Sequence, residues 1–342
     1  MPLYVDCYEY ELNLPQTYNI ANAKWSPNGD EILITSEVFK IELFPISYHF
    51  MILDTTLKNN LEEVFSFSSE CFWFDNTACW LSDSTFIFNV EKRLDNSLRN
   101  NPKIIYKFNL SSRETTRIYE DEDYFYLRDA FAQNLLLIKT PENVFFAHVS
   151  PHSGGVMSLY KKSLKDSSEP VGLTPLHPDT LLPLSAVYSA RFVSNNKVVY
   201  EKCVVKTPGG DMVRRLEIMD LANRSSQLLK EYKFSIEDSE GTGFEVSPSG
   251  EWLIYLPSYS FIISSLHPTD DTLRLLSVIN PEIEKRLVLR RNYGDKKNFS
   301  YKRYKFWAVD WSRKGDKILC IGEERRTKER KLFIVKLPKH IN

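Results

Sequence analysis

The sequence contains little glycine and no cysteine pairing motif. Its 342 residues include 12 glycines and 5 cysteines. No Gly-x-x-x-x-Gly-Lys or Gly-x-Gly-x-x-Gly segment occurs, which excludes the common nucleotide-binding loops. The cysteines show neither a Cys-x-x-Cys pair nor metal-ligand spacing, and their odd number indicates reduced, mostly buried thiols. We therefore predict no cofactor and a cytoplasmic location.

Targeting and membrane-spanning segments are also missing from the sequence. The first residues, Met1 to Asp6, lack the positive region and apolar core of a signal peptide. No apolar run approaches the length needed to cross a bilayer, so we expect no membrane insertion. The whole chain has a formal net charge of −1, which gives no overall attraction to nucleic acid or membrane.

Catalytic and metal-binding motifs are scarce. A serine nucleophile on a Gly-x-Ser-x-Gly turn is absent. His148 and His152 have the spacing by which a helix chelates a metal, but Pro151 between them disfavours a helix. We therefore predict no metal site and name no catalytic residue.

A strand-turn-strand phrase is repeated along the chain. Three copies are sharp, with a serine, a turn rich in Pro, Asn, Gly and Asp, and then an apolar triplet. Three others are weaker. The anchor residues are Ser26, Ser82, Thr140, Ser194, Ser247 and Ser312, and they are separated by 56, 58, 54, 53 and 65 residues. This period suits a four-stranded unit with generous loops.

Each phrase predicts a β-hairpin, because its turn residues fix φ or tolerate positive φ. The triplet after the turn is apolar at consecutive positions, as in Ile32-Leu33-Ile34, which indicates a strand covered on both faces. A third strand, rich in aromatic and branched residues, and usually a short fourth one follow. Six repeats of four antiparallel strands predict an all-β fold, a six-bladed β-propeller.

The last repeat has room for only three strands, because the chain ends at Asn342, soon after the apolar run Leu332 to Leu337. The segment Tyr4 to Leu12, with Tyr8, Tyr10 and Leu12 spaced by two, supplies the missing strand. We expect it to pair with the last blade and close the ring, which removes an exposed sheet edge. The prediction is one domain spanning residues 1–342.

The phrase Trp/Val-Ser-Pro-x-Gly-Asp/Glu followed by an apolar triplet resembles the repeats of TolB-type propellers, also found in prolyl-oligopeptidase-like enzymes. It is clearest at Trp25 to Asp30 and Val246 to Glu251. The resemblance implies a propeller fold. Propellers of this type serve protein contacts or gate a separate hydrolase domain, and the chain has no room for such a domain.

Basic residues are concentrated near the C-terminus. From Lys285 to Lys331 there are 17 Lys or Arg and 6 Asp or Glu, a net charge of +11 against −12 for the rest. Aromatic residues are interleaved with them, a combination that binds phosphates, bases or acidic protein segments. The predicted partner-binding residues are Arg290, Arg291, Tyr293, Lys296, Lys297, Tyr301, Lys302, Arg303, Arg325 and Arg326.

These features lead to the prediction of a non-enzymatic interaction module, or scaffold, that binds a macromolecule through its basic loop face. We expect a protein partner with an acidic surface, with nucleic acid as the other possibility. The competing interpretation is a hydrolase or lyase with its site in the central channel of the propeller. Several His, Arg and carboxylate side chains facing one another there, with a pocket around them, would favour the enzyme.

Overall fold

The computed structural model describes most of the chain and consists of β-strands. The described residues are 2–10, 12, 14–15, 17–39, 45–56, 60–68, 72–92, 103–121, 125–131, 134–139, 158–165, 168–174, 185–205, 212–233, 244–255, 273–291, 304–324, 326–338 and 341. They form 24 strands, and none of these residues belongs to an α-helix.

Sixteen strands form four antiparallel sheets, each with its strands in chain order. The first sheet contains β2 (Tyr18–Trp25), β3 (Glu31–Phe39), β4 (Pro45–Asp54) and β5 (Asn60–Ser68). The second contains β6 (Phe72–Ser82), β7 (Thr85–Lys92), β8 (Lys103–Asn109) and β9 (Glu114–Asp121). The third contains β10 (Phe125–Phe131), β11 (Asn134–Lys139), β12 (Ser158–Ser163) and β13 (Val171–Gly172). The fourth contains β14 (Ser185–Ser194), β15 (Lys197–Val205), β16 (Met212–Asp220) and β17 (Ser226–Lys233).

The remaining eight strands form one sheet in the order β18-β19-β20-β21-β1-β24-β23-β22. Its first four strands are β18 (Phe244–Val246), β19 (Trp252–Tyr255), β20 (Arg274–Ser277) and β21 (Glu284–Arg291). Its others are β1 (Leu3–Tyr10), β24 (Arg330–Lys336), β23 (Lys317–Glu324) and β22 (Tyr304–Trp311). The sheet thus joins two four-strand units through the N-terminal strand.

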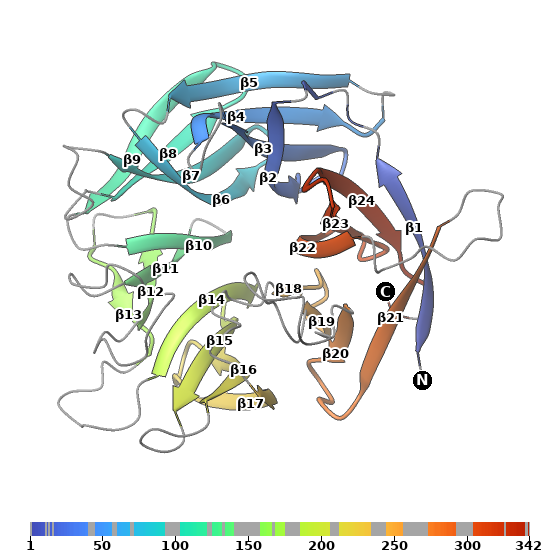
Figure 1. The fold of residues 1–342 in the computed structure, drawn as a ribbon. Coiled ribbons are helices and arrows are strands. Elements are labelled where there is room, and N and C mark those ends of the chain that lie inside the picture. The colour runs from blue at the N-terminus through green and yellow to red at the C-terminus, as the bar shows by residue number, and fades with distance from the viewer. Residues whose placement is uncertain are drawn as a thin grey trace.

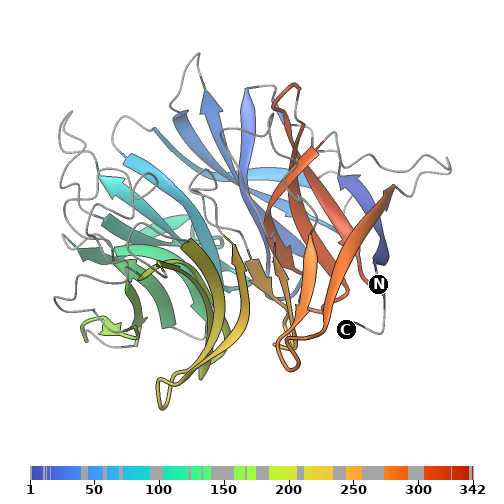
Figure 2. The same cartoon turned by 60° about the horizontal axis from the view of Figure 1, so that its bottom comes forward.

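The strands β2, β6, β10, β14, β18 and β22 surround a common centre, and the later strands of each unit lie farther out (Figure 1). After a rotation of 60° the units fan out around this centre (Figure 2). This is the arrangement of a β-propeller.

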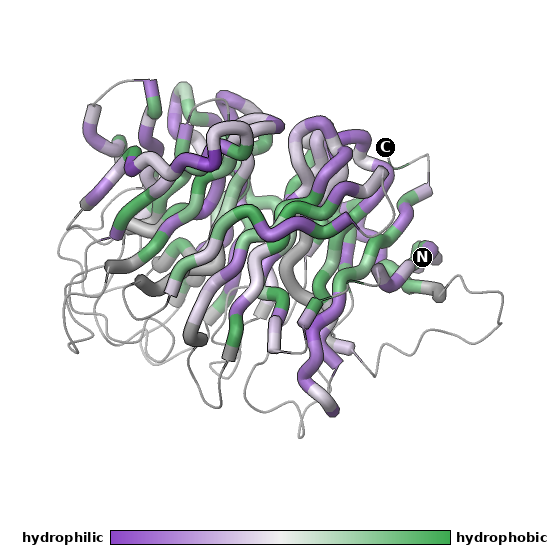
Figure 3. Tube along the Cα trace, turned by 90° about the horizontal axis from the view of Figure 1, so that it is seen from above, coloured by the Kyte–Doolittle hydropathy of each residue, from purple (hydrophilic) through white to green (hydrophobic). Residues whose placement is uncertain are grey.

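Six apolar clusters lie between neighbouring units. They join the first unit to the second, the second to the third, the third to the fourth, the fourth to β18–β20, β19–β20 to β22–β24, and β22–β24 back to the first. Leu33 faces the second unit, while Ile32 and Ile34 face the last, as the run of three apolar residues predicted. Hydrophobic stretches accordingly run along the strands (Figure 3).

The sharp copies of the phrase form the same turn. Ser26 Oγ accepts a hydrogen bond from Glu31 N at 3.0 Å, and Ser247 and Ser312 make the equivalent bonds to Trp252 N and Lys317 N at 3.1 Å. The glycine three residues after each serine has a φ of 71 to 82°, a region that strongly favours glycine. The repeated serines therefore have a structural role.

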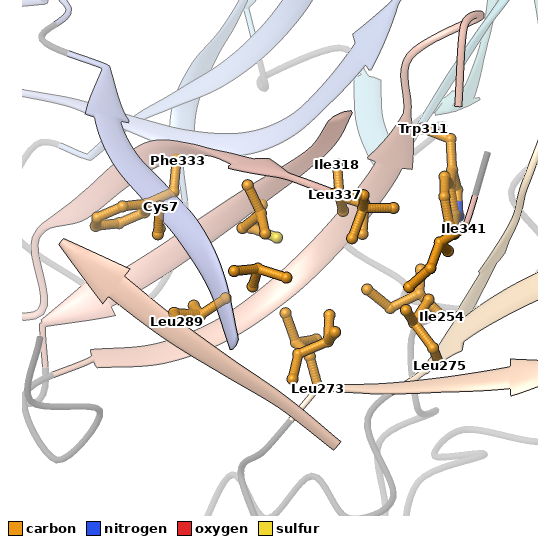
Figure 4. Close-up of a cluster of buried hydrophobic side chains, with 14 of the residues drawn as sticks. Cys7, Ile254, Leu273, Leu275, Leu289, Trp311, Ile318, Phe333, Leu337 and Ile341 are labelled. Atoms are coloured by element: carbon orange, nitrogen blue, oxygen red, sulfur yellow. The ribbon is translucent and has the colours of Figure 1, made fainter. Parts of the chain in front are cut away.

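Strand β1 confirms the predicted pairing of the N-terminus with the last repeat. It lies antiparallel to β24, with Cys7 opposite Val335 and Tyr10 opposite Leu332. It also lies parallel to β21, with Cys7 opposite Arg291, and this pairing was not predicted. Cys7 and Leu289 then point into the cluster that holds this sheet together (Figure 4).

The predicted position of the first hairpin in the third repeat is wrong. We expected its hairpin at Thr140 to Phe146, which lies outside the described residues. The first hairpin of this unit instead joins β10 to β11 between Phe131 and Asn134. Its connecting residues are Ala and Gln, which carry no turn signal.

Candidate active site

One residue from each innermost strand lines a pocket at the centre of the molecule. These six residues, here called the channel ring, are Lys24 of β2, Cys79 of β6, Asp129 of β10, Arg191 of β14, Glu245 of β18 and Asp310 of β22. The pocket has a volume of about 220 Å³. Side chains that are far apart in the sequence therefore converge at one place.

The six positions are structurally equivalent. Each lies opposite the middle residue of the apolar run on the second strand of its unit. The pairs are Lys24 with Leu33, Cys79 with Ile87, Asp129 with Leu136, Arg191 with Val199, Glu245 with Ile254 and Asp310 with Leu319. All six partners are at most 1% exposed, so the second strands form a rigid apolar support for the ring.

Glu245 is the centre of the ion pairs. Its Oε1 lies 2.6 Å from Lys24 Nζ, and Arg191 Nε lies 2.9 Å from both of its carboxylate oxygens. Burial alone would raise the pKa of Glu245, but the two cations lower it below its ordinary value. Burial likewise acts to lower the pKa of Lys24, yet Asp310 and Glu245 raise it. Glu245, Lys24 and Arg191 are therefore all ionised at neutral pH.

Two aspartates of the channel ring each accept a hydrogen bond from a backbone N–H group. Asp310 Oδ2 accepts a hydrogen bond from Trp25 N at 2.6 Å, and Asp129 Oδ2 accepts one from Phe192 N at 2.7 Å. Each carboxylate thus binds the backbone of the next unit. Burial raises the pKa of both, that of Asp310 to about 6, although Lys24 opposes the rise at Asp310 and Arg191 opposes it at Asp129. A carboxyl group with such a pKa is suited to general acid-base catalysis.

Cys79 contributes no reactive thiolate. Burial and the nearby charge of Asp129 raise the pKa of its thiol to about 12. The thiolate is the nucleophilic form, so this cysteine is inert at neutral pH.

Aromatic side chains form part of the pocket wall. Phe131, at the end of β10, is 44% exposed, and its ring lies 6.0 Å from that of Phe192. Trp80 also lines the pocket, and its Nε1 donates to Lys24 O at 3.1 Å. Pockets that combine aromatic surface with a few fixed charges are typical of small-molecule sites.

The partner-binding residues predicted from sequence are not among those that line this pocket. Arg290 and Arg291 belong to β21, and Arg326 is exposed in the turn before β24. Tyr293, Lys296, Lys297, Tyr301, Lys302, Arg303 and Arg325 lie outside the described residues. The basic patch remains a prediction.

The channel ring itself was missed. In the three sharp copies a charged residue stands two positions before the serine, namely Lys24, Glu245 and Asp310. That regularity was the available signal. In the units of Cys79 and Arg191 the serine comes one residue later, because β-bulges follow Trp80 and Phe192.

The described part of the chain shows neither a metal-binding cluster nor a membrane-spanning helix. It contains no group of three or more His, Cys, Asp or Glu side chains that could hold a metal ion. Over the same residues, no helix has the length and apolarity required to span a bilayer.

No family model matches the sequence, and no curated protein matches it. Solved structures match over nearly the whole chain. An oligogalacturonate lyase in complex with manganese is 12% identical, with 100% of this chain and 98% of the other covered and a TM-score of 0.53. The GH93 α-L-arabinofuranosidase of Fusarium graminearum with arabinobiose is 11% identical, with 96% and 98% covered and a TM-score of 0.55.

The β-propeller domain of the Trilobed protease from Pyrococcus furiosus is 10% identical to this chain. The match covers 94% of each chain, with a TM-score of 0.50. These likenesses establish a β-propeller fold, which is the fold that the resemblance of the repeats to TolB-type propellers implied.

The prediction of a non-enzymatic scaffold is wrong. Two of the structures that match from end to end are enzymes, so a chain of this size and fold needs no additional hydrolase domain to be an enzyme. The expected arrangement for an enzyme is met in part, because Arg191, Lys24 and three carboxylates line one pocket, while no histidine is among the described residues that line it.

Proposed function

We propose that residues 1–342 form a single six-bladed propeller, with β1 as the outermost strand of the sixth blade. The support is twofold. Six ring positions share one register, and six apolar clusters join successive units back to the first. On this proposal the eight-stranded sheet is two blades, β18–β21 and β22–β24 with β1, joined at their outer edges.

We infer that the chain is a hydrolase whose active site is the channel pocket and whose substrate is a saccharide. The observation that carries this proposal is the pair Asp129 and Asp310, which have raised pKa values and line the same pocket. Glycosidic bonds are commonly cleaved by two carboxyl groups with different protonation states. The two enzymes with the same fold act, by their descriptions, on an oligogalacturonate and on arabinose-containing saccharides.

The two aspartates take different roles in this proposal. They belong to the third and sixth units, so on this proposal they lie on opposite sides of the channel ring. Asp310 retains a proton up to a pH of about 6 and serves as the acid that protonates the leaving oxygen. Asp129, whose charged form is stabilised by Arg191 and by Phe192 N–H, serves as the base or nucleophile. Glu245 positions the two cations and does not exchange protons.

Hydrolysis fits the pocket better than elimination of a uronate does. A lyase must neutralise the substrate carboxylate, yet the cations Lys24 and Arg191 are already paired with Glu245. Lys24 has a raised pKa and is not available as a base. At a volume of about 220 Å³, the pocket is smaller than the roughly 300–1,000 Å³ sites of drug-sized ligands. A single neutral sugar unit is therefore the expected occupant.

The test is a product assay on neutral and uronic oligosaccharides between pH 4 and 8. Hydrolysis releases reducing ends, whereas elimination also creates an absorbing unsaturated sugar. Asp310→Asn and Asp129→Asn should each lower turnover at least about 100-fold, since general acid-base groups contribute roughly 10²- to 10⁴-fold. The matched control is Asp30→Asn, an exposed aspartate in the β2–β3 turn. Unaltered turnover in both ring variants, or no cleavage of any saccharide, contradicts the proposal.

A further inference from the structure

A second cluster of reactive side chains lies on β2, β4 and β5 of the first sheet, and none of its residues lines the channel pocket. Ser47 Oγ is 2.8 Å from His49 Nε2, and His49 Nδ1 is 3.0 Å from Glu63 Oε2. Tyr18 completes the cluster, because its hydroxyl donates to the same carboxylate oxygen at 3.4 Å. The rings of Tyr18 and His49 are 4.5 Å apart.

The β-sheet explains how these residues meet. Ser47 and His49 are two apart on β4, so their side chains share one face. Between β4 and β5 the register shifts, with Phe50 opposite Phe65 but Met51 opposite Glu63. This bulge leaves one extra residue on β5 and turns Glu63 onto the face of His49. Bulges often aim a side chain at an active site in this way.

One arrangement of protons satisfies the contacts that join Ser47, His49 and Glu63, and the Tyr18 hydroxyl also lies 3.2 Å from His49 Nδ1. The Nδ1–H group of His49 donates to Glu63, and its Nε2 accepts the hydroxyl proton of Ser47. The Tyr18 hydroxyl donates to Glu63 as well. This is the order of groups in a nucleophilic triad, in which the carboxylate fixes the imidazole and the imidazole activates the hydroxyl. The triad is recognised by geometry, so the lack of a Gly-x-Ser-x-Gly turn does not exclude it.

A buried hydroxyl group supplies an independent observation at the same place. Ser36 lies directly opposite His49 on β3 and is 1% exposed. Its Oγ has no hydrogen-bond partner within the described part of the chain. Opposite residues of an antiparallel pair have Cβ atoms roughly 5 Å apart, so Ser36 is a donor within reach of a group bound at His49. The His49 side chain is 14% exposed and that of Glu63 is 42% exposed, which leaves the cluster accessible.

We propose that Ser47, His49 and Glu63 form a second catalytic site that hydrolyses carboxylic esters through an acyl-serine. Ser47 Oγ attacks the ester carbonyl carbon while its proton passes to His49 Nε2. The carbon–oxygen bond to the alcohol breaks, and His49 returns the proton to the departing alkoxide. Water then attacks the acyl-Ser47, again through His49, and releases the carboxylic acid. Leu12, Leu14 and Tyr18 pack against the same apolar cluster, which favours a short apolar acyl group.

Labelling with a fluorophosphonate tests this proposal, with peptide mass spectrometry to locate the modified residue. The phosphonate bonds to an activated serine oxygen and fluoride leaves. The expected result is one labelled site at Ser47, with p-nitrophenyl butyrate hydrolysed by the unlabelled protein. Ser47→Ala should abolish both, and His49→Gln should slow both at least about 100-fold.

Glu63 acts through His49 and is a positioning residue, so Glu63→Gln should lower the maximal labelling rate at least about tenfold without weakening reversible inhibitor binding. Glu63→Asp should restore part of that rate. The matched control is Ser66→Ala, an exposed serine opposite His49 on β5. Absence of label at Ser47 under conditions that label a known serine esterase overturns the proposal, as does label that persists in Ser47→Ala. Asp310→Asn should leave the labelling of Ser47 unchanged. The proposal for this site and the proposal for the channel pocket are therefore tested independently.

Discussion

Asp310 should make the stability of the protein fall as the pH rises from about 4 to about 6. Burial raises the pKa of its carboxyl group from 3.8 to about 6, although the neighbouring Lys24 acts in the opposite direction. The folded protein therefore holds this proton more tightly than the unfolded chain does. The resulting stability is fully present below pH 3.8 and is lost as the pH passes through the folded-state pKa of about 6.

The expected change in unfolding free energy follows from the size of the pKa shift of Asp310. One pKa unit corresponds to about 1.4 kcal/mol, so the ionisation of Asp310 costs the folded state roughly 3 kcal/mol. The side chain is only 18% exposed, so solvent screens this effect little. Asp310→Asn removes the titrating group but keeps an oxygen that can accept the hydrogen bond from Trp25 N. The variant should gain roughly 3 kcal/mol relative to the wild type between pH 4 and pH 7.

The assay is urea unfolding of both proteins at several pH values, followed by fluorescence, with Asp30→Asn as the exposed control. If the difference in unfolding free energy between wild type and Asp310→Asn is the same at pH 4 and pH 7, the carboxyl group is not held in the environment described.

Three other perturbations test the fold and the ring. Deletion of residues 2–10 removes the strand between β21 and β24 and should give an aggregating protein in size-exclusion chromatography; a soluble monomer with an unchanged Tm would contradict the closure. Gly250→Ala should destabilise by roughly 2–4 kcal/mol in chemical unfolding, because the φ is +73° and the added Cβ would meet Val193 Cγ1 at 2.7 Å, whereas Gly315→Ala, with nothing within 4 Å, should cost only about 1–2 kcal/mol. Glu245→Gln leaves Lys24 and Arg191 without their shared carboxylate and should cost roughly 3–5 kcal/mol, against almost no change for the exposed Glu282→Gln in the same unfolding assay.

Much of the fold was predictable because each repeat carries local signals. The turn from Ser26 to Glu31 contains a glycine at positive φ, and the triplet Ile32 to Ile34 forms a strand that is buried on both faces. Both features can be recognised from the amino-acid sequence. The hairpin after Phe131 was not predictable, because its connection has no turn residue. The pairing of β1 with β21 could not be foreseen either, since it depends on where two blade edges meet in space.

The candidate site was harder to predict because its groups come from six different strands. No short segment contains both Asp129 and Asp310, and their raised pKa values result from burial in the folded state. The cluster of Ser47, His49 and Glu63 was equally hidden, since a bulge in the sheet decides which face Glu63 occupies. A comparison of equivalent positions across the repeats would have shown the charged residue two before the serine.

The location of a bound saccharide tests the central claim most directly. A crystal structure of Asp310→Asn, soaked with an oligosaccharide that the wild-type protein cleaves, should show one sugar unit in the channel pocket, beside Phe131 and between Asp129 and the substituted position. A saccharide bound elsewhere on the propeller, with the channel pocket empty, would contradict the assignment of the channel ring as the active site.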